Sequence, residues 1–123
     1  MRYLRKISPV KELFWLFLII GFYLFVSFFR LGSVPPGVNN DEAIIGYDAY
    51  SIWNTGRDHW GKIMPIEFQS FGDYKLPVYP YLSAQLVGLL GLTVFSVRLL
   101  SVLGGLGCVI LTYLIGKKIF SSR

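Results

Sequence analysis

Two adjacent carboxylates, Asp41 and Glu42, come first among the residues that could do chemistry. Asn40 before them is a plausible N-cap, and both acids fall in a first helical turn, where the partial positive charge of a helix N-terminus stabilises carboxylates. Capping alone explains such a pattern. A carboxylate beside a membrane can also act as a general base on an acceptor hydroxyl or amine. The pattern leaves both interpretations of the pair open.

A lysine and an arginine form the second group of candidates. Lys75 lies in the stretch 71–77, FGDYKLP, where a polar loop meets an apolar run. This is the depth of a lipid phosphate, with which lysine can pair as a point charge. Lysines at membrane edges also extend toward water without binding a ligand. Arg98 lies one turn inside an apolar run, where it could extend outward, pair with an acid such as Asp41 or contact an anionic ligand.

The single histidine and the single cysteine give weaker signals. His59 and Asp58 could suggest a metal, but two potential ligands are too few, and we expect both residues in a solvated loop. Cys108 has no partner for an intrachain disulfide, and we expect it to be a small buried residue. A divalent metal stays possible as a cofactor, although these residues do not identify one.

The elements that must position these residues are typical of a membrane protein. Hydrophobic residues make up 54% of the chain and charged residues only 15%, which is too apolar for an ordinary soluble domain of this size. The uncharged stretch 13–29 approaches the roughly 20 residues that cross about 30 Å of hydrocarbon, and 94–116 is a second apolar run. A cleavable signal peptide is the rival interpretation of 13–29, but this run lacks a small-residue cleavage site. The sequence predicts an all-α integral membrane chain with two transmembrane helices.

The distribution of charge predicts the orientation. Basic residues gather in the tail 1–12 and at the end 117–123, whereas the segment 30–93 is acidic once Arg30 is assigned to the end of a span. The positive-inside rule then makes both ends cytoplasmic and 30–93 an external loop. We therefore expect a multi-pass protein of the inner cell membrane, with membrane lipid and not nucleic acid as the partner that explains the net charge of +5.

The external loop is long enough to hold structure of its own. We expect one juxtamembrane helix at about 41–54, ended by Thr55-Gly56, and a second at about 80–90. The apolar run around the second helix could also be a third span. A third span would put Lys117 and Lys118 on the acidic side of the membrane, so we favour a juxtamembrane or partly inserted helix.

The order and spacing of several short motifs are similar to those of a known family. They are NDEA at 40–43, GY at 46–47, TGRD at 55–58, SFGDYK at 70–75 and RL at 98–99, with Gly61, Pro77 and Tyr79 between them. From about residue 30 to the C-terminus the pattern resembles the N-terminal segment of GT-C membrane glycosyltransferases. More narrowly, it resembles the bacterial dolichyl-phosphate-mannose-protein mannosyltransferase-like and aminoarabinose-transferase-like enzymes.

The resemblance implies an activity and roles for individual residues. Such enzymes transfer a sugar from a polyprenyl-phosphate donor, here to an unidentified acceptor on the extracytoplasmic side. They are several times longer, so we expect this chain to be an N-terminal piece that is inactive alone. Asp41 matches the family's candidate catalytic base, with Glu42 supporting it, and Lys75 matches the lysine associated with the lipid phosphate. Possible supporting residues are Asp73, Tyr74 and Arg98.

The resemblance leaves metal dependence open. Tyr74 stands where aminoarabinose-transferase-like members carry a glutamate that helps hold a metal, and Leu76-Pro77 replaces the family's Pro-Pro. Two other function classes fit parts of the chain. A small two-span scaffold or assembly subunit without catalysis would need only the spans and the structured loop. A transporter fragment would need polar breaks within the spans, and only Arg98 offers one.

Overall fold

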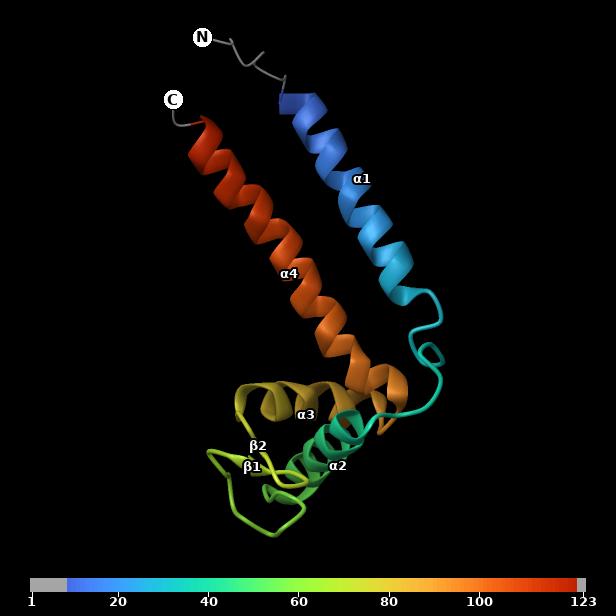
Figure 1. Ribbon diagram of the computed structural model, residues 1–123, viewed down its shortest axis with the longest axis vertical. Helices are drawn as coiled ribbons and strands as arrows, with labels where there is room; N and C mark the ends of the chain where they lie inside the picture. Colours follow the sequence, from blue (N-terminus) through green and yellow to red (C-terminus); the bar gives the residue numbers. More distant parts are fainter. Residues whose placement is uncertain (1–8, 122–123) are drawn as a thin grey trace. The chain divides into compact units, whose positions relative to one another are not determined.

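The computed structural model describes residues 9–121 and is mostly helical (Figure 1). Two compact units divide the chain: unit 1 holds the chain up to Phe29 and again from Gly104, and unit 2 holds Arg30–Leu103. The elements in chain order are α1 Pro9–Phe28, α2 Asn40–Thr55, β1 Phe68–Gln69, β2 Tyr74–Lys75, α3 Val78–Leu90 and α4 Val94–Ser121.

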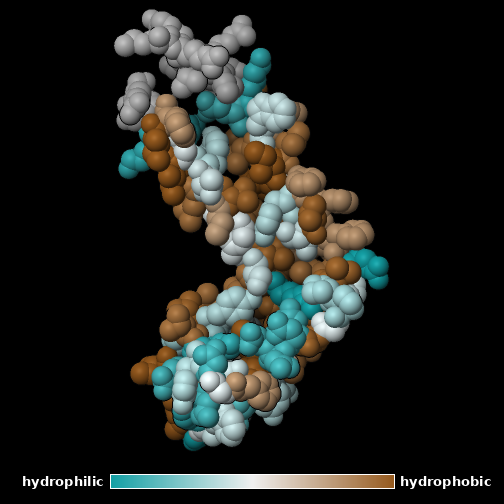
Figure 2. Space-filling model, viewed as in Figure 1, coloured by the Kyte–Doolittle hydropathy of each residue, from teal (hydrophilic) through white to brown (hydrophobic). Residues whose placement is uncertain are grey.

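Unit 1 consists of α1 and the later part of α4, which run antiparallel. Near one end Glu12 contacts Lys117 at 3.4 Å, and near the other the Tyr23 ring lies against Gly105, where an added Cβ would collide with it. The segments Val10–Phe28 and Val94–Phe120 are long and apolar enough to cross a membrane. Figure 2 shows hydrophobic residues along both helices, and none of the α1 span is buried.

Unit 2 has a small core where α2 packs on α3 and on the first turns of α4. Its buried residues are small, so the helix backbones approach closely: Ala49, Ala84, Val87 and Val97, with Ile45 and Ile52 against them. Gly46 faces Val97, and a Cβ added at Gly46 would lie 2.9 Å from the Val97 Cγ2 atom. This packing fixes the direction of α2 and hence of the acids in its first turn.

Both ends of α2 are capped by local sequence. The Asn39 side chain accepts a hydrogen bond from the Asp41 amide at 2.6 Å, and the Asn39 amide donates to Glu42 Oε2 at 3.3 Å, which is a reciprocal capping box. The prediction of Asn40 as N-cap is therefore wrong by one residue, because Asn39 is the residue with extended backbone. At the other end Gly56 adopts the left-handed conformation, φ 69°, that the Thr55-Gly56 signal predicts.

The prediction of a helical chain with two long apolar helices is confirmed, and several details differ. The all-α prediction missed the antiparallel pair of β1 and β2. With 13 residues, α3 is too short for the third span left open by the sequence. Helix α4 continues through Lys117 and Lys118 to Ser121. Cys108 is exposed in the chain and not buried, because the neighbouring helix leaves that side of α4 uncovered. Residues 1–8 and 122–123 of the predicted cytoplasmic ends lie outside the described residues.

Candidate functional site

Lys75 and Asp41 meet although 33 residues separate them in the sequence. The Lys75 Nζ atom lies 2.8 Å from Asp41 Oδ1 and 3.2 Å from Asp73 Oδ2. We call Asp41, Asp73 and Lys75 the Lys75 cluster. The cluster brings together three of the residues selected from the sequence, namely the candidate base, the candidate phosphate ligand and one possible supporting acid.

The β1–β2 hairpin directs Lys75 toward α2. Lys75 is paired with Phe68 and Tyr74 with Gln69, and directly opposed residues of an antiparallel pair share one face. Phe68 is 1% exposed, so its face is the inner one and Lys75 follows it. Tyr74 belongs to the other face and is 58% exposed. The hairpin thus turns this possible supporting residue away from the Asp41 carboxylate.

The electrostatics of the Lys75 cluster keep its lysine charged. Hydrogen bonds to Asp41 and then to Asp73 raise the pKa of Lys75 above its ordinary value. The pKa of Asp73 is lowered, first because its carboxylate accepts the Tyr74 backbone N–H and then because of Lys75. An ammonium group has three N–H donors, and the two acids accept two of them. The third has no acceptor among the described residues.

The Lys75 cluster lines an open hollow of about 600 Å³ at the start of α2. Its other walls are Asn39, Asn40, Ser70 and Phe71. A helix N-terminus favours anions. Lys75 adds a positive charge and one further N–H donor. The hollow therefore places the Lys75 ammonium and the start of α2 next to a carboxylate that is 58% exposed on its side chain.

Glu42 points away from this hollow and pairs with Arg98. The guanidinium Nε donates to Glu42 Oε1 at 2.8 Å and one Nη donates to Glu42 Oε2 at 3.0 Å. The remaining donors reach the backbone carbonyls of Leu31, Pro35 and Gly37 at 3.1, 3.2 and 2.9 Å. We call these five residues the Arg98 cluster. Five N–H groups make five bonds, so the guanidinium is fully used.

The Arg98 cluster gives a structural role to two motif residues, Glu42 and Arg98. Arg98 is 7% exposed, and its bonds join the loop at 31–37, the start of α2 and the start of α4. Hydrogen bonds from Arg98, and then from the Asn39 amide, lower the pKa of Glu42 despite its partial burial. From the sequence, Arg98 could pair with an acid such as Asp41. In the structure it pairs with Glu42 and not with Asp41. Neighbouring helix residues point about 100° apart, so both acids cannot face one cation.

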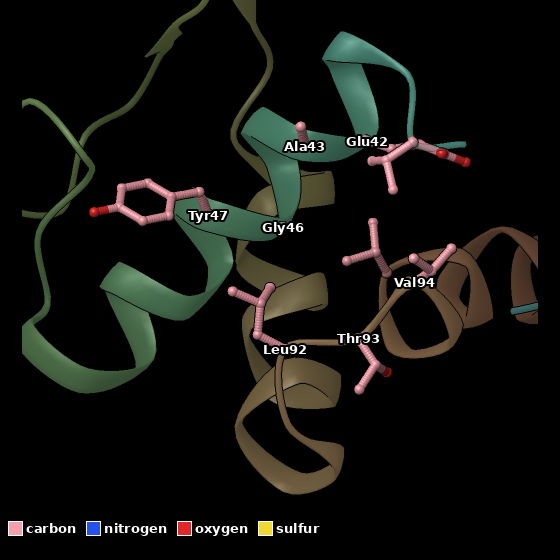
Figure 3. Close-up of a pocket in the computed structure, with 9 residues that line it drawn as sticks. Glu42, Ala43, Gly46, Tyr47, Leu92, Thr93 and Val94 are labelled. Carbon is pink, nitrogen blue, oxygen red and sulfur yellow. The ribbon is translucent and has the colours of Figure 1, made fainter.

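A second pocket, of about 240 Å³, is apolar and lies between α2 and the start of α4 (Figure 3). Ala43, Gly46 and Tyr47 line it from α2, and Leu92, Thr93 and Val94 line it from the segment that enters α4. Glu42 is its acidic residue, and Arg98 holds that carboxylate. The pocket can accommodate an apolar group.

The TGRD motif leads into a loop whose backbone is hydrogen-bonded to the Asp58 side chain. The prediction that Asp58 lies in a solvated loop is wrong. Asp58 is 3% exposed, and its Oδ1 accepts the backbone N–H groups of Trp60 and Lys62 at 2.9 and 2.8 Å. Asp48 of α2 is completely buried; its Oδ1 accepts the His59 backbone N–H at 3.0 Å and lies 2.6 Å from the His59 ring Nδ1. Sequence reasoning missed Asp48, although a lone acid among the apolar residues 44–49 was a signal.

Within residues 9–121, no three histidine, cysteine or acidic side chains come together in a way that would hold a metal ion. Comparison with known proteins found no matching family model, curated protein or solved structure. The geometry of the two charged clusters therefore carries the functional argument.

Proposed function

We propose that this chain is a membrane segment of a glycosyltransferase that moves a sugar from a polyprenyl-phosphate donor to an acceptor outside the cytoplasm. The observation that carries the proposal is the contact of Lys75 with Asp41 at the start of α2. It joins a positive group suited to phosphate and a carboxylate suited to proton transfer, and both line one open hollow.

The proposed step uses both groups. The donor phosphate binds the third N–H of Lys75 and the positive end of α2. Asp41 takes the proton of an acceptor hydroxyl or amine as the acceptor oxygen or nitrogen bonds to the anomeric carbon. The bond from that carbon to the phosphate oxygen breaks, and the oxygen leaves with the electron pair. The Lys75 ammonium then faces the additional negative charge.

Two features support a membrane setting for this step. A helix that is hydrophobic all round belongs in a large core or in a bilayer, and the α1 span is wholly unburied in the chain. Lys75 adjoins the apolar residues that begin α3, so a lipid phosphate at the membrane surface could reach it. In this proposal both ends of the segment are cytoplasmic, by the positive-inside rule.

A non-catalytic scaffold or assembly subunit is the second candidate. The Arg98 cluster favours it, because a fully bonded guanidinium explains Glu42 and Arg98 through structure alone. In a scaffold, the Lys75 cluster would act only as a set of surface ion pairs.

The test measures sugar transfer from a labelled polyprenyl-phosphate sugar. It uses membranes that contain the protein expressed from the complete reading frame that encodes this segment. Lys75→Ala should reduce kcat/KM by about a hundredfold or more, since one preorganised charge at a leaving group has that effect. Lys75→Arg should restore part of the loss because it keeps the charge.

Lys62→Ala is the matched control. It removes another lysine of the same loop, one that is exposed and does not line the hollow, and it should transfer at close to the wild-type rate. Equal transfer by wild type and Lys75→Ala, at equal protein amounts, would contradict the proposal and favour the scaffold.

A further inference from the structure

The imidazole of His59 is fixed by a buried carboxylate. Its Nδ1 lies 2.6 Å from Asp48 Oδ1, and the His59 backbone N–H donates to the same oxygen at 3.0 Å. Asp48 is completely buried, whereas the His59 side chain keeps 19% of its surface exposed. An ionised carboxylate only accepts hydrogen bonds, so a hydrogen on Nδ1 would point at Asp48 and leave Nε2 as the outward polar atom, an acceptor in a neutral ring and a donor in a protonated one. The ring edge that bears Nε2 is directed away from Asp48.

Two exposed aromatic rings flank this imidazole. The Trp60 ring centroid lies 5.0 Å from that of His59, and the Tyr47 ring meets His59 edge-on at 6.3 Å. Trp60 is 60% and Tyr47 57% exposed. Trp60 is nevertheless held, because its amide donates to Asp58 and its indole N–H donates to the Gln69 carbonyl at 3.3 Å. Large exposed rings held in one orientation are typical of a binding surface.

One carboxylate oxygen of Asp48 and one of Asp58 are buried beside this arrangement. Asp48 Oδ2 and Asp58 Oδ2 are buried without a hydrogen-bond partner among the described residues, and such atoms cost stability. Local rules broken in this way are expected at functional sites. Simple attachment of the 57–63 loop to α2 would not require an imidazole, since any side-chain donor to Asp48 would serve.

We propose that His59, Trp60 and Tyr47 form a binding subsite for a sugar ring. The C–H face of a sugar can stack on Trp60, and a rim hydroxyl, which can donate or accept, can form a hydrogen bond with His59 Nε2; this combines an aromatic wall with one placed polar group. A bilayer-surface anchor would use the aromatic rings but not the oriented ring nitrogen. Asp48 lies seven residues after Asp41, about two turns or 10 Å along the same face of α2. The subsite is thus separate from the Lys75 cluster.

The test is direct binding and needs no transfer activity, so its failure is distinct from failure of the proposed function. The full chain is placed in phosphatidylcholine nanodiscs that contain no sugar detergent. Methyl glycosides of glucose, mannose, galactose and arabinose are titrated by saturation-transfer NMR. At least one should bind saturably, with a dissociation constant on the order of millimolar.

Two substitutions of one residue separate binding from structure. In His59→Asn the amide nitrogen takes the place of Nδ1, so the bond to Asp48 is kept while Nε2 and the ring contacts with Tyr47 and Trp60 are lost. His59→Gln keeps a polar group near Nε2 but loses the bond to Asp48. His59→Asn should weaken binding at least tenfold with little change in the unfolding midpoint. Trp60→Leu should weaken binding as much, and its midpoint should fall slightly because the indole bond to the Gln69 carbonyl is lost. The control Tyr50→Leu, at another exposed tyrosine of α2, should bind normally.

The proposal is overturned if no glycoside binds saturably. It is also overturned if His59→Asn binds like wild type while His59→Gln unfolds, since His59 would then only anchor the loop.

Discussion

Asp41 and Glu42 are neighbours in the sequence but belong to two different regions of unit 2. Asp41 faces an open hollow, where its side chain is 58% exposed and contacts a lysine. Glu42 faces the protein, where a fully bonded arginine that is 7% exposed holds both of its oxygens. Two adjacent acids can therefore have different surroundings and different roles, because a helix turns about 100° between adjacent residues.

The two clusters should also differ energetically. Exposed ion pairs contribute little to stability, so the Lys75 cluster can exchange a carboxylate for a ligand at small cost. The Arg98 cluster is different, because Arg98 is buried and Glu42 is half-buried, so removal of Glu42 leaves a buried cation without its charged partner. We therefore propose that the Lys75 cluster carries binding and chemistry and that the Arg98 cluster supports the fold.

The largest effect on stability is expected from Arg98→Lys. Lysine keeps the charge but supplies three N–H donors where arginine supplies five, so at least two bonds to Glu42 or the 31–37 carbonyls are lost. The thermal midpoint in nanodiscs should fall by about 5–10 °C. Arg57→Lys is the control, since Arg57 is exposed and its side chain donates only to the Gly61 carbonyl among the described residues. Equal midpoints for both variants would remove the distinction between the clusters.

A smaller effect is expected where α2 packs beside the Arg98 cluster. In Gly46→Ala the new Cβ would lie 2.9 Å from Val97 Cγ2 and 3.3 Å from Leu92 Cδ1. Overpacking of this kind costs about 1–3 kcal/mol in the free energy of unfolding, which denaturant titration in nanodiscs can measure. Gly104→Ala meets no atom within 4 Å and should not be destabilised. A stable Gly46→Ala protein would mean that α2 and α4 are not packed this closely.

The smallest effect is expected in the pH dependence of stability. The pKa of Glu42 in the folded chain lies below its ordinary value of 4.5, so the unfolded state takes up the proton first. The stabilisation is present above about pH 4.5 and is lost as the pH falls through the folded pKa. Thermal midpoints measured from pH 6 to about pH 3 should fall for wild type and fall less for Glu42→Gln. Parallel curves would contradict a charged Glu42 in the Arg98 cluster.

Much of the helical fold could be predicted because its signals are local. Apolar runs determine α1 and α4, and the Thr55-Gly56 signal ends α2 where a left-handed glycine is needed. The error at the N-cap came from two consecutive asparagines, either of which could have capped the helix. The two-residue strands give almost no sequence pattern, so β1 and β2 were missed.

The pairing of charges could not be predicted, because it depends on which faces of distant elements meet. The sequence selected Asp41, Glu42, Lys75 and Arg98 but did not indicate that Lys75 would pair with Asp41 and Arg98 with Glu42. The Asp48–His59 pair was hidden for the same reason, since the 57–63 loop must fold back on α2 before the two residues meet. Catalytic roles for Asp41 and Lys75 stay predictions.

The most direct test of the roles proposed for the two clusters compares Asp41→Asn with Glu42→Gln in the protein expressed from the complete reading frame. Sugar transfer and thermal midpoint are measured on the same membranes. We expect Asp41→Asn to lower transfer by about a hundredfold or more without a change in the midpoint. We expect Glu42→Gln to lower the midpoint while its folded fraction still transfers sugar. Normal transfer by Asp41→Asn, together with loss of transfer by a fully folded Glu42→Gln protein, would show that the roles of the two acids are the reverse of those proposed.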